Sequence, residues 1–236
     1  VLARRMWAWL APFQPQVLWV VPEVWAVSVG RALQRQSGLP LHATVHDAPE
    51  SARLGGLPPL CSAAYVRRLR RLLRGADSVD AVSDGLLDHL RATHAVGAAT
   101  ATLVVPPAMD ACHALAAPAD PEWHGHTMRR IGLCGSFRAS SEQWGGFMQT
   151  LSRLPFSVVL VSFTPRADLP PMPLPSNVTL DQQPFFEREQ DVIRALATTD
   201  ACYLPLWTDA RRGLFGATSL SSKLTTYLAA ARPVRS

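Results

Sequence analysis

Cysteine pairs and long apolar runs are both scarce in this sequence of 236 residues. Its four cysteines are far apart and form no C-x-x-C pair, so neither a zinc ribbon nor a disulfide framework is predicted, and a reduced compartment is the default. No apolar run reaches the roughly 18 residues of a membrane span, because Pro22 and Glu23 interrupt the most apolar stretch, VLWVVPEVWAVSVG. No signal peptide is recognised, and we expect a cytoplasmic protein.

Charge is also sparse, since charged residues make up 17% of the chain whereas hydrophobic residues make up 48%. This balance argues against disorder and allows one large domain or two smaller ones. The net charge of +5 comes from scattered arginines and a single lysine, Lys223, which indicates an anionic partner but not a nucleic acid. Five arginines share one predicted helix, and they suit either an anionic membrane surface or, as the favoured interpretation, solvent: Arg67, Arg68, Arg70, Arg71 and Arg74.

Short apolar runs alternate with longer helical patterns through most of the chain. The predicted strands cover residues 16–21, 41–46, 78–83, 101–106, 129–136, 156–163, 177–180 and 201–206. The predicted helices cover residues 23–36, 59–73, 84–93, 140–154 and 187–198, with a last helix within 219–234. Near-continuous apolar strands that alternate with helices predict an α/β protein whose parallel sheets are covered by helices on both faces.

The alternation lapses between residues 109 and 128, where Ala, Pro and His dominate. We therefore predict two Rossmann-like domains, residues 1–112 and 128–236, joined by a linker at 113–127. The chain lacks an initial methionine and stops where an apolar strand begins, so we expect a fragment truncated at both ends, with both domains incomplete. No metal site is expected, because the linker histidines lack a matching second pair of ligands.

The segment TVHDAPE places His46 and Asp47 at the carboxyl end of a predicted strand. Open α/β sheets bind their ligands at this edge, and a histidine there can act as an acid or base near neutral pH. The alternative, a strand-end histidine followed by a helix-capping aspartate, remains equally open.

The segment IGLCGSFRASSEQW places Gly135 and Ser136 between a predicted strand and a predicted helix. Small residues there let backbone N–H groups approach a phosphate, and Arg138 could add charge. The spacing matches neither G-x-G-x-x-G nor a Walker loop, so a tight turn is the favoured interpretation.

The segment SLSSKLTTYLAAARPV starts a predicted helix, with Lys223 in its first turn behind the capping types Ser221 and Ser222. A helix N-terminus offers unpaired N–H groups and partial positive charge, which suit a diphosphate. Lysine is mildly disfavoured there unless an anion binds, although an ordinary capped helix remains an equal alternative. Upstream, Phe185 and Phe186 could stack on a base, but core packing is favoured.

Six segments, taken in chain order, resemble the GT-B-fold glycosyltransferases of the family 4 type, from about Gln16 onward. They are LPLHATVHDAP, ADSVDAVSDGLLDHL, LVVPPAMD, RRIGLCGSF, TDACYLPL and SLSSKLTTYLAAARPV. The resemblance implies two Rossmann-like domains and a nucleotide-sugar donor held mainly by the second. It also implies sugar transfer, usually with retention and without a metal or cofactor, to a saccharide or lipid-linked acceptor in polysaccharide or glycoconjugate assembly. Peripheral contact with the inner face of the membrane is compatible with it.

The resemblance also implies roles for individual residues. His46 matches a histidine that contacts the donor sugar near the reacting centre, and it is the expected catalytic residue. The expected contacts to the donor diphosphate are Gly135, Ser136, Arg138, Ser222 and Lys223. The expected contacts to the donor sugar or cleft are Asp47, Thr218, Thr226 and Tyr227. Phe185 and Phe186 are expected beside the base.

Three positions depart from the family pattern. Many members carry two glutamates where this sequence has Thr218 and Thr226, and a common glycine is Ala231 here. Two alternatives stay open: a nucleotide-sugar epimerase or hydrolase, which could share this fold, and a non-catalytic module that binds nucleotide-sugars, which the missing acids favour.

Overall fold

The computed structural model of the chain consists of two compact units. Unit 1 contains Val1–Pro106 with Trp207–Leu220, and unit 2 contains Pro107–Leu206 with Ser221–Ser236. The structure describes residues 2–53, 57–94, 96–108, 129–134, 141–164, 169–171, 173–205, 213, 218 and 221–235. The predicted linker, 113–127, lies outside the described residues, so its bounds stay a prediction.

Unit 1 is built on a four-stranded parallel sheet of order β1-β2-β3-β4. Its strands are β1 (Leu18–Val20), β2 (Leu41–Val45), β3 (Ser78–Ala81) and β4 (Ala101–Val104). Its helices are α1 (Leu2–Leu10), η1 (Ala11–Phe13), α2 (Ala26–Ser37), η2 (Pro49–Arg53), α3 (Pro59–Leu73) and α4 (Asp84–Thr93). Because consecutive strands are neighbours, each connecting helix returns on the same side of the sheet.

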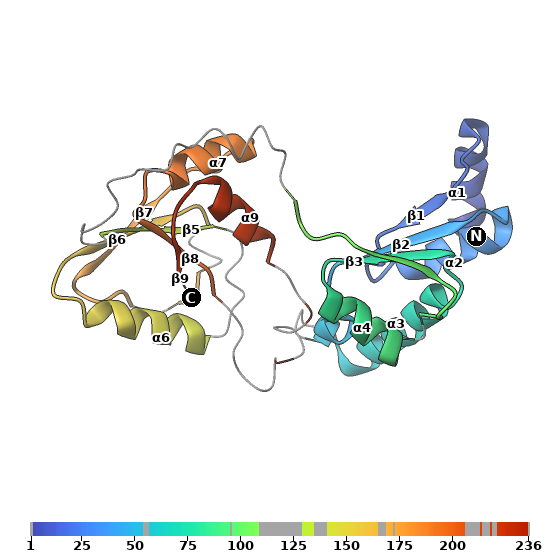
Figure 1. Ribbon diagram of the computed structural model, residues 1–236, viewed down its shortest axis with the longest axis horizontal. Coiled ribbons are helices and arrows are strands. Elements are labelled where there is room, and N and C mark those ends of the chain that lie inside the picture. Colours follow the sequence, from blue (N-terminus) through green and yellow to red (C-terminus); the bar gives the residue numbers. More distant parts are fainter. Residues whose placement is uncertain are drawn as a thin grey trace. The chain divides into compact units, whose positions relative to one another are not determined.

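The described helices cover one face of this sheet. Leu18 and Val20 of β1 are buried, whereas Trp19 between them is 73% exposed. On the covered face α2 lies so close to β1 that a Cβ on Gly30 would come within 2.8 Å of a Val20 methyl group. Figure 1 shows α3 and α4 on one side of the sheet. On the other face Thr44 and Asp80 are also buried, although Trp19 is exposed.

Polar side chains pair with one another on the open face. Asp80 is 6% exposed, and its Oδ1 accepts a hydrogen bond from the Thr44 hydroxyl at 2.6 Å and lies 2.7 Å from His42 Nε2. Trp19 Nε1 donates to the Thr44 hydroxyl at 2.7 Å, and His42 Nδ1 lies 2.9 Å from the Ser78 hydroxyl. These partners satisfy a buried carboxylate, so the network has a structural explanation.

Unit 2 is built on a five-stranded parallel sheet of order β7-β6-β5-β8-β9. Its strands are β5 (Arg130–Leu133), β6 (Val158–Ser162), β7 (Val178–Gln182), β8 (Ala201–Tyr203) and β9 (Val234–Arg235). Its helices are α6 (Ser141–Ser152), α7 (Glu189–Leu196) and α9 (Ser222–Ala229). In Figure 1, α6 covers one face of the sheet, and α7 and α9 cover the other, as predicted.

The strand order of unit 2 reverses at its centre. From β5 the chain proceeds outward to β6 and β7, then crosses to β8 on the other side of β5 and continues to β9. Open α/β sheets bind ligands at the carboxyl edge where the order reverses. The end of β5 at Leu133 and the end of β8 at Tyr203 therefore mark the switch point.

The predicted α/β class with parallel sheets and flanking helices is confirmed, and the bounds of α3 and α4 agree with the prediction to the residue. α1 and η2 have no counterpart among the predicted elements. Within the described ranges, no helix is long and apolar enough to cross a bilayer.

Candidate functional site

Tyr227 of α9 forms hydrogen bonds to the backbone at the switch point of unit 2. Its side chain is fully buried, and its hydroxyl accepts a hydrogen bond from the Cys134 backbone N–H at 2.9 Å and donates to the Tyr203 carbonyl at 3.1 Å. Burial raises the pKa of this phenol far above its ordinary value. The hydroxyl of Tyr227 thus ties together the backbone at the ends of β5 and β8, and its expected place at the donor sugar or cleft stays a prediction.

α9 begins at the same edge, with Ser221 at its N-cap in an extended conformation and no side-chain capping hydrogen bond. Ser222 is exposed and Lys223 is half-buried. Burial lowers the pKa of Lys223, whereas the nearby Cys134 thiolate would raise it. Lys223 in turn lowers the pKa of Cys134 against the larger raising effect of burial. The predicted lysine therefore lies beside the carboxyl end of β5.

Glu189 is a carboxylate that the sequence analysis missed. It starts α7, is exposed, and accepts a hydrogen bond at 3.3 Å from the hydroxyl of Thr226, which is only 8% exposed. Its charge raises the pKa of Cys134, so it too lies near the end of β5. An acid in the first turn of a helix is ordinary dipole chemistry, so the sequence offered no signal for this contact across 37 positions.

Thr218 belongs to unit 1. It is 2% exposed, and its carbonyl accepts a hydrogen bond from the Ser83 hydroxyl at 2.6 Å. Ser83 also caps α4 by accepting from the Leu86 N–H at 3.1 Å. The described contact of Thr218 is thus made by its backbone.

The two phenylalanines after β7 differ in their surroundings. Phe185 is 88% exposed, so the favoured core packing is wrong for this ring. Phe186 packs against Phe163, with ring centroids 5.8 Å apart. Phe185 alone is open to stack on a ligand, and its role beside a base remains a prediction.

The predicted phosphate loop follows β5 directly. Gly135, Ser136 and Arg138 lie outside the described residues, so their roles remain predictions. Cys134, which comes immediately before them, is held by its N–H bond to Tyr227.

In unit 1, His46 and Asp47 lie at the carboxyl end of β2, as the sequence predicts, and both are exposed. Ala48 and Pro49 behind them are buried. The chain then enters η2, so a short exposed loop presents the histidine at the carboxyl edge of the sheet.

Glu50 follows this loop and lies between two histidines. Its Oε2 is 3.0 Å from His89 Nε2, and its Oε1 is 2.8 Å from His94 Nε2. Burial alone would raise the pKa of Glu50, but the hydrogen bonds from His94 and His89 lower it to about 2. Among the described residues, Glu50, His89 and His94 form the only group of three or more metal-ligand side chains with ligand atoms within 4.8 Å of one another.

A family of known proteins matches the first part of this sequence. Residues 1–111 match the model of the family described as Glycosyltransferase Family 4. No curated protein matches the sequence.

Solved structures resemble the whole chain in fold. Sucrose-phosphate synthase from Thermosynechococcus elongatus is 14% identical with a TM-score of 0.66, over 99% of this chain and 58% of that one. Anabaena HepE, solved in complex with UDP, is 14% identical with a TM-score of 0.61, over 99% and 62%. A glycosyltransferase from Rickettsia africae is 14% identical with a TM-score of 0.56, over 85% and 54%. At such identities the likeness supports the GT-B fold, and this chain spans less than two thirds of each structure.

Proposed function

We propose that this chain, whose residues 1–111 belong to Glycosyltransferase Family 4, is part of an enzyme that transfers a sugar from a nucleotide-sugar donor to an acceptor. We further propose that unit 2 binds the donor, that transfer proceeds with retention and without a metal or cofactor, and that the acceptor is a saccharide or a lipid-linked saccharide. Polysaccharide or glycoconjugate assembly at the cytoplasmic face of a membrane fits these proposals.

One observation carries the proposal: α9 begins at the switch point of the sheet in unit 2. Its first turn brings Lys223 beside Cys134 at the end of β5. The N–H groups of a helix's first turn and a cation favour an anion at this place, and a diphosphate supplies the charge. HepE, which has the same fold, was solved with UDP and with UDP-glucose.

The geometry suits the departure of a diphosphate. Developing negative charge on the leaving group is stabilised by Lys223 and by the N-terminal N–H groups of α9, which need not reorganise during the reaction. The hydrogen bonds of Tyr227 hold the backbone of Cys134 and Tyr203 in place, so these groups also need not reorganise during the reaction. His46 keeps its proposed role at the donor sugar in this account.

We propose that Glu189 partly replaces the two glutamates that many family members carry at the positions of Thr218 and Thr226. Its carboxylate, held by the Thr226 hydroxyl, supplies an exposed acceptor for a ligand hydroxyl from a different helix. A carboxylate at this edge supports the enzyme interpretation. The second candidate function, a module that binds nucleotide-sugars without turnover, is favoured by the two missing acids and predicts binding without transfer.

Donor binding by the full-length protein tests the proposal, with UDP and UDP-glucose as probes in isothermal titration calorimetry. Lys223→Ala should weaken binding of both about tenfold, because one charge-assisted contact is lost. Arg194→Ala is the matched control, since Arg194 is a surface cation of unit 2 that pairs with Asp191 on α7. A Lys223→Ala protein that binds both probes as tightly as wild type would overturn the diphosphate assignment.

A further inference from the structure

The two histidines that contact Glu50 reach it from one helix and its end. His89 lies on α4, and His94 is the C-cap of α4 and is fully buried. Arg70 of α3 approaches His94 from the opposite side of the ring, with its Nε 3.4 Å from His94 Nδ1. Glu50 thus ties η2 to α4, and α3 supports the buried histidine of this tie.

The hydrogen positions in this group follow from its partners. An arginine can only donate, so His94 Nδ1 accepts from Arg70 and His94 Nε2 carries the hydrogen that Glu50 accepts. The Thr93 hydroxyl donates to the His89 carbonyl at 2.6 Å, so its oxygen can only accept from His89 Nε2 at 3.3 Å. Both Nε2 atoms therefore donate to the Glu50 carboxylate.

These hydrogen positions do not fit a metal ion. A metal would need the lone pair of each Nε2, and each ring would then carry its hydrogen on Nδ1. For His94 that hydrogen would face the N–H of Arg70, which places donor against donor. The group fits a hydrogen-bonded clasp in which one carboxylate receives two ring N–H groups.

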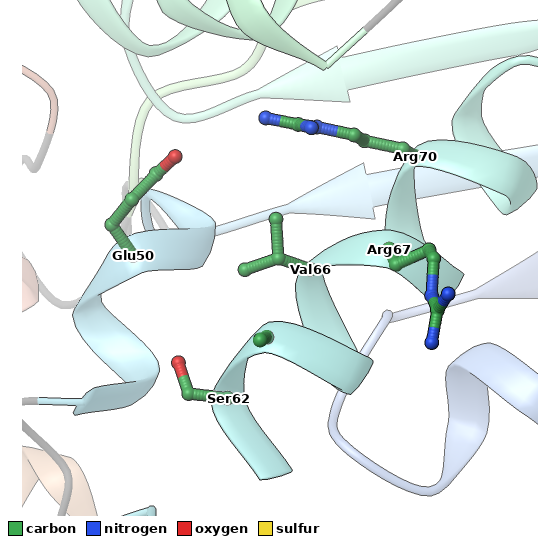
Figure 2. Close-up of a pocket in the computed structure, with 6 residues that line it drawn as sticks. Glu50, Ser62, Val66, Arg67 and Arg70 are labelled. Carbon is green, nitrogen blue, oxygen red and sulfur yellow. The ribbon is translucent and has the colours of Figure 1, made fainter. Parts of the chain in front are cut away.

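A pocket lies beside this clasp of Glu50, His89 and His94. The pocket has a volume of about 330 Å³, and it is lined by Glu50 and by α3 residues that include Ser62, Val66 and Arg70. Figure 2 shows Glu50 on the η2 side of the pocket and the labelled α3 side chains on the other. η2 also packs against α3, so the hydrogen bonds from His89 and His94 attach it to a second helix, α4, on the side of Glu50.

We propose that Glu50 is a positioning residue, which holds the loop after β2 so that His46 is presented in one orientation at the edge of the sheet. Only Asp47, Ala48 and Pro49 separate the two side chains, and Ala48 and Pro49 are buried. A shift of the backbone at Glu50 should therefore also shift the backbone at His46. The assignment of His46 to the reaction rests on the proposed function, whereas the ordering of the loop does not.

The test uses the full-length protein and three variants, with rates normalised to the fraction that binds UDP. Glu50→Ala should lower kcat for transfer from UDP-glucose about ten- to a hundredfold with KM for the donor nearly unchanged, because misplacing a reacting group costs rate rather than donor affinity. Glu50→Gln keeps one acceptor for His94 but turns its NH2 toward the N–H of His89, so it should restore only part of the loss. Asp88→Ala, on the exposed face of α4, should match wild type.

Hydrogen exchange of residues 46–50 gives a second readout that does not depend on turnover. Exchange should be faster in Glu50→Ala and unchanged in Asp88→Ala. Unchanged exchange with normal kcat in Glu50→Ala would overturn the positioning role while leaving the proposed function intact. A zinc content of one per chain that Glu50→Ala abolishes would replace the clasp with a metal site. A wild type that transfers no sugar from any nucleotide-sugar tested would overturn the proposed function and the catalytic part of this proposal with it.

Discussion

The two sheets of this protein share parallel strands but differ in winding. In unit 1 the described strands follow one another in chain order, helices cover one face, and Trp19 is exposed on the other. In unit 2 the strand order reverses between β5 and β8, and helices cover both faces. Reversal creates a crevice at the carboxyl edge, and a continuous order does not. In our proposal, the donor site of unit 2 therefore lies where the strand order reverses, whereas unit 1 presents His46 on a loop.

Each arrangement requires its own support. At the switch point of unit 2, one buried phenol, Tyr227, bonds the ends of two strands. At the edge of unit 1, one carboxylate, Glu50, fastens the loop after His46 to α4. The first support is a fixed part of the core, and the second is a partly exposed group that depends on charge. The following predictions test this contrast, from the largest expected effect to the smallest.

Removing the phenolic oxygen of Tyr227 should have the largest effect. Tyr227→Phe leaves the Cys134 N–H without this partner, and such a loss should lower the free energy of unfolding by about 1–3 kcal/mol. It should also weaken UDP binding, because the end of β5 is no longer fixed. Chemical denaturation and calorimetry measure the two effects.

The matched control is Tyr65→Phe in unit 1, where the hydroxyl donates to the Pro22 carbonyl at 2.9 Å. This variant should leave UDP affinity unchanged. Equal losses of UDP affinity in the two variants would contradict a specific role of the switch point in UDP binding.

Acid should weaken unit 1 through Glu50. The pKa of Glu50 is lowered from 4.5 to about 2 in the folded protein, so its contribution is present above the unfolded value and is lost as pH falls toward 2. Because the side chain is 41% exposed, solvent screening limits this contribution to about 1 kcal/mol. Denaturation of wild type and Glu50→Gln between pH 6 and pH 2.5 should show the steeper loss in wild type. Parallel curves would contradict the charge dependence of the clasp.

The smallest effect concerns the end of α9. Ala231 has a φ of 52°, in the left-handed region that favours glycine. Ala231→Gly should therefore raise the free energy of unfolding by about 0.5–1 kcal/mol. Ala230→Gly, at the adjacent cap with a φ of −72°, is the control and should not stabilise. An Ala231→Gly variant whose free energy of unfolding is unchanged or lower would contradict backbone strain at Ala231.

The sequence predicted the parts of the fold that local chemistry determines. α3 starts with a proline in its first turn, and α4 starts after Ser83, whose hydroxyl caps it, so both bounds could be read directly. The resemblance to a family whose members often carry glycine before the last strand also drew attention to Ala231, and its φ gives the physical reason.

Longer-range features were out of reach. Glu50 meets His89 and His94 across 39 and 44 positions, and Glu189 meets Thr226 across 37, with no pattern in the sequence to connect them. The burial of Tyr227 depends on how α9 packs against the sheet, which periodicity alone does not specify.

Hydrogen exchange with and without UDP tests the central claim most directly, that unit 2 binds the donor diphosphate at its switch point. In the full-length protein, UDP should slow exchange at residues 132–134 and 221–224 and leave residues 46–50 unchanged. Lys223→Ala should reduce that protection at equal UDP concentration. UDP binding that protects neither segment of unit 2 would contradict the claim.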